Sequence, residues 1–258
     1  MTTDNFWNYF HEIYETLPRQ GPGDRESTLH ALRLLPALTH EHRILDIGCG
    51  VGAQTLDLAG ATQARIVATD NHAPFLALLS AHASSLGLEE RMTTQVADMA
   101  DLPFPDGSFD VIWSEGAIFI MGFAQGLSAW RRLLAAGGHM VVSEFCWLSD
   151  DPPAEVRELF GDGSDDVGDV AARRKAIAES GYTLLHEFML PATGWWDNYY
   201  VPLGEALGRF RKKHEGNAEA LAVAARSQRE IDVYRRHPET FGYVFFVMRR
   251  DDGLIPTP

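Results

Sequence analysis

The sequence has 258 residues, of which 45% are hydrophobic and 22% are charged. That length and composition suit one large folded domain and exclude a disordered or fibrous protein. The formal net charge of −14 argues against nucleic acid and anionic membranes as partners, because both attract basic surfaces. The two cysteines, Cys49 and Cys146, form neither a disulfide framework nor a zinc motif.

The chain shows no sign of a membrane segment or of a targeting signal. No apolar run approaches the ~20 residues that a membrane-spanning helix needs, and residues 1–10 lack the pattern of a signal peptide. We therefore expect a cytoplasmic protein that binds no metal ion. The sequence leaves the oligomeric state open, a homodimer included.

Residues 1–40 are expected to form two helices joined by a turn. Phe6, Phe10 and Ile13 recur at helical spacing, and Pro18 ends that first segment. The turn at 19–23 contains two glycines and a proline. Together with the aromatic first helix, this turn is expected to act as a lid over a ligand site.

Strands alternate with helices between residues 41 and 150. The five expected strands are rich in aliphatic residues and lie near 43–47, 65–70, 93–96, 109–113 and 140–144. Such alternation predicts a parallel sheet with helices on both faces, wound by right-handed crossovers. Two more strands are expected near 182–190 and 243–248, and the segment 191–240 between them should be a helical insertion.

The first expected strand runs into a glycine-rich turn, residues 48–52. Glycines allow a tight turn and let a ligand approach the main chain, and the helix that follows presents free N–H groups. The pattern alone is weak, because residues 48–53 also fit the loose dinucleotide fingerprint. An ordinary tight turn is the simpler alternative.

Three carboxylates narrow the choice of ligand. Asp46 stands just before the glycines, where it can accept a hydrogen bond from an ammonium group but would repel a pyrophosphate. Asp70 ends the second strand, a position from which a carboxylate binds ribose hydroxyls. Asp98 follows the third strand and can accept from an adenine amine. An aminoacyl-adenosine ligand without phosphates would use all three, although a turn or helix cap is the alternative for Asp70 and Asp98.

Two stretches carry a family resemblance. The run at 44–52, Ile-Leu-Asp-Ile-Gly-Cys-Gly-Val-Gly, resembles the first motif of the class I S-adenosylmethionine (SAM)-dependent methyltransferases. The stretch at 98–112 resembles the ubiquinone/menaquinone C-methyltransferase branch of that superfamily. Residues 20–23, 113–118 and 196–202 are similar to a group of bacterial methyltransferases of unassigned substrate.

The resemblance implies an α/β, doubly wound fold. Its sheet would be Rossmann-like, seven-stranded and mostly parallel, with the last strand antiparallel. An N-terminal helical lid and a helical insertion before the last strand would complete it. One domain would then occupy residues 1–258, with lid helices at 1–40, a SAM-binding core at 41–150 and a substrate lid at 191–240.

The resemblance also implies roles for single residues. Gly48, Gly50 and Gly52 would approach the methionine part of SAM, and Asp46 would lie near its amino group. Asp70 would bind the ribose hydroxyls. The other residues expected at the cofactor lie in the turn before the second helix and after strands two, three and four: Gln20, Gly21, Asn71, Asp98, Met99 and Ser114.

The chemistry of methyl transfer needs alignment of the acceptor and exclusion of water. A base is needed only if the acceptor must lose a proton. Glu115, after the fourth strand, is the candidate base or substrate anchor, with a solvated loop residue as the alternative. Trp195, Tyr199 and Tyr200 are the candidate walls of the acceptor site, and packing of the insertion onto the sheet is the alternative.

We therefore expect an enzyme that transfers a methyl group from SAM to a small-molecule acceptor, giving S-adenosylhomocysteine (SAH). An NAD(P)-dependent oxidoreductase is one alternative, but it leaves Asp46 and the stretch 98–112 unexplained. A non-catalytic SAM-binding protein and a methyltransferase acting on protein or RNA are the others. The sequence identifies neither the acceptor nor the atom that receives the methyl group.

Overall fold

The structure is a computed structural model that describes residues 3–161 and 167–253. Its centre is a seven-stranded sheet in the order β3-β2-β1-β4-β5-β7-β6. The strands are β1 (Arg43–Ile47), β2 (Arg65–Asp70), β3 (Met92–Val96), β4 (Phe109–Glu115), β5 (Leu134–Trp147), β6 (Tyr182–Met189) and β7 (Phe241–Arg250). β7 pairs antiparallel with both β5 and β6, while the pairs among β1 to β5 are parallel. The expected doubly wound sheet with an antiparallel last strand is confirmed.

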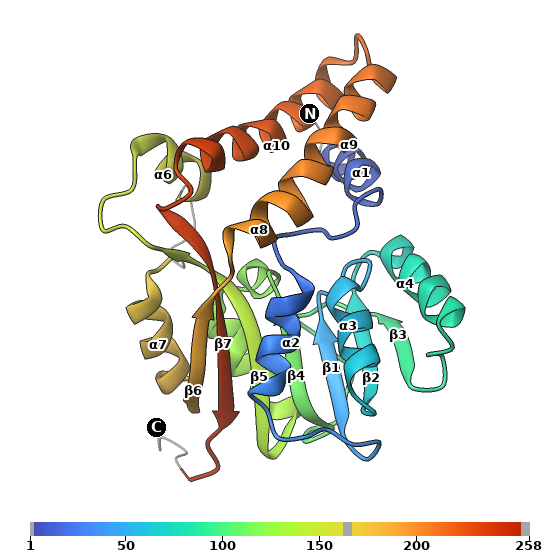
Figure 1. Ribbon diagram of the computed structural model, residues 1–258, viewed down its shortest axis with the longest axis vertical. Coiled ribbons are helices and arrows are strands. Elements are labelled where there is room, and N and C mark those ends of the chain that lie inside the picture. The colour runs from blue at the N-terminus through green and yellow to red at the C-terminus, as the bar shows by residue number, and fades with distance from the viewer. Residues whose placement is uncertain (1–2, 162–166, 254–258) are drawn as a thin grey trace.

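Helices cover both faces of the sheet and its upper edge (Figure 1). The α-helices are α1 (Thr3–Tyr14), α2 (Arg25–Arg33), α3 (Ala53–Ala61), α4 (Ala73–Ser85), α5 (Phe123–Trp130), α6 (Ala154–Phe160), α7 (Val170–Glu179), α8 (Ala192–Trp195), α9 (Val201–Lys213) and α10 (Ala218–Arg236). Short 3₁₀ turns η1 (Ile118–Ile120) and η2 (Arg131–Leu133) flank α5, and one π-helical turn, η3 (Trp196–Tyr200), joins α8 to α9.

Consecutive residues of the central strands point to opposite faces of the sheet, and buried apolar side chains cover both faces. Ile44 packs among residues of α2, α3 and α4, whereas Leu45 packs among residues of α5 and α7. Val141 and Val142 divide in the same way on β5. Strands buried on both sides need continuous apolar runs, which explains the sequence signal in this part of the chain.

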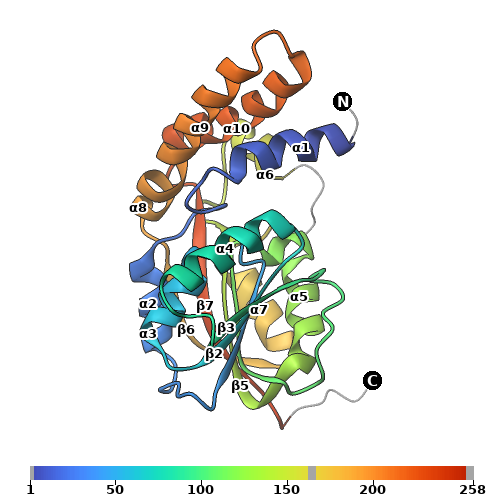
Figure 2. The same ribbon diagram turned by 90° about the vertical axis from the view of Figure 1, so that its right-hand side faces the viewer.

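A separate helical layer lies over the carboxyl edge of the parallel strands. Figures 1 and 2 show α1 beside α9 and α10, above the sheet and its flanking helices. Glu12 of α1 accepts from Lys213 Nζ at 2.8 Å and lies 2.9 Å from His214 Nε2. Residues from the two ends of the chain therefore build this layer together.

Three details differ from the sequence-based expectation. α1 ends at Tyr14 and not near Pro18. β5 is longer than 140–144 at both ends: it begins at Leu134, opposite Phe109 of β4, and its final residues pair with the start of β7, up to Trp147 opposite Phe241. α6 was not predicted, since its seven residues carry only a short apolar pattern.

Candidate active site

The glycine turn between β1 and α3 is narrow and tightly bonded. The amides of Gly48 and Cys49 donate to the Thr69 carbonyl at 2.8 and 3.0 Å. Gly50 has φ +56°, and a Cβ there would lie 2.3 Å from Gln20 Oε1. A residue with a side chain at position 50 would therefore be strained and would also displace Gln20. The group that approaches the main chain here is Gln20, so the approach of a ligand stays a prediction.

Asp46 lies beneath the turn and not on its surface. Its side chain is fully buried, and it accepts from Thr55 Oγ1 at 2.6 Å and from Gln54 Nε2 at 3.4 Å. Burial, more than the opposing hydrogen bond from Thr55, raises the pKa of Asp46 to about 7. Asp46 thus ties the first turn of α3 to β1. An ammonium group could reach this carboxylate only by replacing Gln54, so the predicted contact with SAM stays a prediction.

Asp70 bridges the end of β2 and the glycine turn. One carboxylate oxygen accepts from the Gly50 amide at 3.0 Å and the other from the His72 amide at 2.9 Å. Each oxygen retains capacity for a second hydrogen bond. The half-buried Asp70 is thus placed beside the glycines, as predicted for a ribose ligand, and Asn71 follows it in an exposed position.

Met99 and Asp98 lie beyond β3, on the other side of the turn. The Met99 Cε would lie 3.5 Å from a Cβ placed on Gly48, so this side chain reaches the glycine turn. Asp98 is exposed, and one of its oxygens accepts from the Ala100 amide at 2.9 Å. Asp98 therefore stabilises a turn, which was the alternative to adenine binding. Its second carboxylate oxygen has no hydrogen bond to any described residue.

Gln20 joins the N-terminal segment to the glycine turn. Its Oε1 accepts from the Val51 amide at 2.8 Å, and its Nε2 donates to the Tyr14 carbonyl at 3.0 Å. A Cβ on the neighbouring Gly21 would have nothing within 4 Å. The structure therefore brings Gln20 to the glycine turn, whereas a side chain at position 21 would point into open space.

Glu115 is held in a way that argues against a catalytic base. Its side chain is 1% exposed and accepts from Arg19 at 2.7 Å, from Thr28 Oγ1 at 2.7 Å and from Trp113 Nε1 at 2.9 Å. A buried carboxylate whose two oxygens already accept three hydrogen bonds from the protein offers little room for contact with a substrate. Glu115 instead fastens the segment between α1 and α2 to the sheet.

Ser114 requires a correction. It was expected after the fourth strand, facing the cofactor, but β4 continues through Glu115, and Ser114 lies fully buried inside that strand. Its hydroxyl donates to the Ile47 carbonyl of β1 at 2.9 Å. A hydroxyl without exposed surface that is bonded to a neighbouring strand links the two strands.

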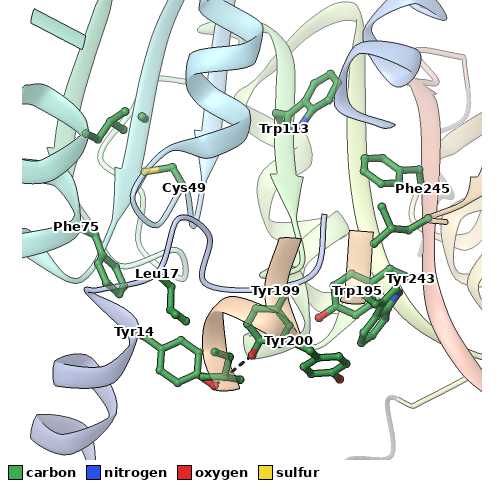
Figure 3. Packing of buried hydrophobic residues seen from close by; sticks show 14 of the residues in the cluster. Tyr14, Leu17, Cys49, Phe75, Trp113, Trp195, Tyr199, Tyr200, Tyr243 and Phe245 are labelled. Carbon is green, nitrogen blue, oxygen red and sulfur yellow. Dashed lines mark hydrogen bonds between the residues drawn. The ribbon is translucent and has the colours of Figure 1, made fainter. Parts of the chain in front are cut away.

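The three aromatic residues of the insertion lie in a packed cluster. Trp195, Tyr199 and Tyr200 are 3%, 4% and 1% exposed. Trp195 stacks on Tyr234 with ring centroids 5.0 Å apart, and the Tyr199 hydroxyl lies 3.2 Å from that of Tyr14 (Figure 3). The packing alternative describes Trp195 and Tyr200 well. Tyr199 reaches α1, so it also joins the insertion to the N-terminal segment.

Two features of this edge were missed from the sequence. Arg19 is buried against Glu115, and His72 lies 2.7 Å from Glu15, just after α1. Each contact joins residues far apart in the chain, so no local spacing could have indicated it. Among the described residues, no group of three or more His, Cys, Asp or Glu side chains is arranged to hold a metal ion.

Comparison with protein families shows which kind of domain contains these site residues. Residues 44–138, which include the glycine turn, Asp70 and Asp98, match the family model described as "Methyltransferase domain". This part of the chain is a methyltransferase domain of the class I SAM-dependent superfamily. The resemblance to the superfamily is thereby confirmed, whereas the likeness to its ubiquinone/menaquinone branch and to bacterial methyltransferases of unassigned substrate stays a prediction.

Curated relatives of this methyltransferase domain are also methyltransferases. The chain is 28% identical over 142 residues to phosphoethanolamine N-methyltransferase 1 of Arabidopsis thaliana, covering 55% of this chain and 28% of the relative. It is 29% identical over 161 residues to sterol 24-C-methyltransferase ERG6B of Gibberella zeae, covering 58% and 42%. Both alignments span less than two thirds of the relative's own length.

A solved structure extends the likeness of this methyltransferase domain to nearly the whole chain. The SAM-dependent methyltransferase from Geobacter sulfurreducens, in complex with SAH, superposes with a TM-score of 0.80. The superposition covers 94% of this chain and 98% of that one, at 22% sequence identity. This similarity establishes the fold, including the helical layer over the sheet.

Proposed function

We propose that this protein is an enzyme that transfers a methyl group from SAM to a small-molecule acceptor and releases SAH. The observation that carries the proposal is the position of Asp70, whose carboxylate is bonded to the Gly50 amide of the glycine turn. It stands in a domain that matches the methyltransferase family over residues 44–138. The organisms and acceptors of the relatives differ, so they support the reaction and not one acceptor.

The residues of the glycine turn suit an aminoacyl-adenosine ligand. The Gly50 amide lies beside the Asp70 carboxylate, and Asp46 directly precedes the turn, where a second negative charge would repel a pyrophosphate. Asp70 would bind the ribose hydroxyls, and Asn71, Asp98 and Met99 would lie at the adenine. When bound, SAM supplies a methyl group already activated by the sulfonium.

The contribution of the chain to the reaction is orientation and exclusion of water. Well-oriented reactants can lower a barrier by ~7–11 kcal/mol without any proton transfer. Because Glu115 is occupied by Arg19, Thr28 and Trp113, we assign it to positioning. The acceptor is then a nucleophile that needs no strong base from this residue.

The helical layer is the proposed cover of the acceptor site. α1, α9 and α10 form this layer, whereas α2, the other helix expected in the lid, packs beside α3 on the sheet. The Tyr14 and Tyr199 hydroxyls lie 3.2 Å apart where the N-terminal segment and the insertion touch. A roofed site of this kind suits a small molecule better than a protein or RNA. We assign the protein to the cytoplasm; within the described residues, no helix has both the length and the apolar character to cross a bilayer.

The sheet order disfavours the oxidoreductase alternative. The classic dinucleotide-binding sheet is mostly parallel and has the strand order 3-2-1-4-5-6. Here the antiparallel β7 separates β5 from β6. A non-catalytic SAM-binding protein would share every feature of the cofactor site, and only turnover separates it from an enzyme.

Calorimetric titration with SAM and SAH, using NAD and NADH as controls, tests the cofactor. We expect micromolar binding of the two adenosyl compounds and none of the nicotinamides; the reverse would overturn the proposal. A panel of amines, phenols, sterols and prenyl compounds, assayed for SAH release, then tests catalysis. Tight SAM binding without turnover on this panel would favour the non-catalytic alternative.

A further inference from the structure

α1 is attached to the methyltransferase domain beside the residues proposed to bind the cofactor. Glu15, directly after α1, places Oε1 2.7 Å from His72 Nε2. The His11 ring of α1 stacks on the His72 ring, with centroids 3.6 Å apart and planes at 18°. His72 is two residues beyond Asp70, and its amide donates to the Asp70 carboxylate at 2.9 Å.

α1 contacts the sheet domain around His72 and contacts α9 through Glu12. Phe75 of α4 packs against His72, with centroids 4.6 Å apart, and lies beneath the His11 ring at 6.1 Å. Glu12, three residues before Glu15, is bonded to Lys213 at the end of α9 and lies 2.9 Å from His214. Glu15 and Glu12, one helical turn apart, therefore tie this segment to two parts of the protein, the sheet domain and α9.

A second connection fixes the base of α1. Gln20 bonds both the Val51 amide of the glycine turn and the Tyr14 carbonyl at the end of α1. Behind it, Arg19 is anchored on Glu115. The chain is therefore held firmly at 19–20, and α1 lies above α4 (Figure 2).

We propose that α1 is the movable roof of the cofactor site and that the contact of Glu15 and His11 with His72 is its latch. The inference rests on the proposed function, because it assumes that Asp70 binds the ribose of SAM or SAH. With the latch closed, His11 of α1 lies against His72, two residues beyond the Asp70 carboxylate that is proposed to bind the ribose. Release of SAH then requires the latch to open, and SAM enters before the roof closes.

The contact between Glu15 and His72 is more exposed, and therefore weaker, than the buried ion pair between Arg19 and Glu115. The side chains of His72 and Glu15 are 16% and 36% exposed, whereas those of Arg19 and Glu115 are 10% and 1% exposed. Partly solvated side-chain contacts of this kind contribute little to stability. Losing the latch should therefore change the SAH release rate by about twofold to fivefold without unfolding the protein.

The test measures SAH release and backbone hydrogen exchange of residues 3–14 in the full-length chain. Glu15→Gln weakens the pair, and His72→Phe removes it while keeping a ring to stack on His11. Glu12→Gln is the matched control, because it loosens α1 from α9 and leaves His72 untouched. We expect SAH to slow exchange in α1, both latch variants to release SAH about twofold to fivefold faster, and Glu12→Gln to release it at the wild-type rate.

The double variant Glu15→Gln/His72→Phe should release SAH no faster than the quicker single variant, since both changes break one contact. Wild-type release rates in both latch variants, or equally fast release in Glu12→Gln, would overturn the latch while leaving the cofactor assignment in place. Absence of SAH binding by the wild-type protein would instead overturn the proposed function and the latch with it.

Discussion

The guanidinium of Arg19 and the carboxylate of Glu115 form an ion pair of 2.7 Å between side chains that are only 10% and 1% exposed. Thr28 and Trp113 donate to the other oxygen of the same carboxylate. The pair connects the segment between α1 and α2 to the end of β4. A residue that the sequence suggested as a catalytic base is thereby assigned to holding the N-terminal segment on the sheet.

Glu115→Gln should therefore act mainly on stability. The change leaves Arg19 buried without a counter-charge, and breaking one partner of a buried pair costs about 3–5 kcal/mol. We expect a fall of that size in the free energy of unfolding, measured with urea. Asp106→Asn is the control, because its pair with Arg132 is 44% and 76% exposed and should contribute less than about 1 kcal/mol. Unchanged stability together with lost methyl transfer would restore Glu115 as a catalytic residue.

Asp70→Ala should weaken SAH binding and keep the fold. Charged hydrogen bonds to a ligand are each worth about 1.5–3 kcal/mol, so the dissociation constant should rise at least about tenfold. Calorimetry gives the affinity, and thermal unfolding checks that the protein stays folded. Asp101→Ala, an exposed carboxylate near Asp98, should bind SAH normally. An unchanged affinity in the Asp70 variant would remove the ribose assignment.

Asp46→Asn should change how stability depends on pH. Burial raises the pKa of Asp46 from 3.8 to about 7 in the folded protein. The folded state therefore binds more protons than the unfolded state between these values, and wild-type stability falls as pH rises through them. Asparagine does not titrate, so the variant does not lose this stability. The difference in free energy of unfolding, variant minus wild type, should be roughly 2–4 kcal/mol larger at pH 8 than at pH 4.

Urea unfolding of the ligand-free proteins at pH 4, 6 and 8 measures this difference. Thr55→Val serves as a companion, because it removes the 2.6 Å hydrogen bond to Asp46 and should steepen the loss of stability at high pH. A difference between Asp46→Asn and the wild type that is the same at each pH would show that the carboxyl is not protonated in the folded state.

SAH release should quicken as the solution becomes acidic. Burial, and then the neighbouring His72, lower the pKa of His11 below its usual 6.5, while Glu15 and Asp70 act against the shift. The closed latch thus favours neutral His11, and its stability is complete above pH 6.5 and declines as pH falls below that value. His11→Phe keeps a ring at this position and should flatten the profile of release rate against pH. A wild-type profile in that variant would show that His11 is not the source of the pH dependence.

The sequence predicted the sheet well because its signal is local. Ile44 and Leu45 are consecutive apolar residues, as a strand buried on both faces requires, and Gly50 occupies a turn that strains other residues. The placement of Ser114 was wrong because the apolar pattern gives no sharp end to β4. The surroundings of Glu115 could not be predicted, since Arg19 and Thr28 reach it from α2 and the segment before it, about 90 positions away.

The position of β7 bears on how the protein is made. β7 is buried from Phe241 to Met248, and in the described sheet it is the strand that joins β6 to the rest. On the ribosome, β6 emerges about fifty residues before its sheet neighbour, so it waits unpaired while the whole insertion is translated. The sheet can then be completed only after the insertion has been translated, so the length of the insertion delays the pairing of β6 as well as providing a cover for the site.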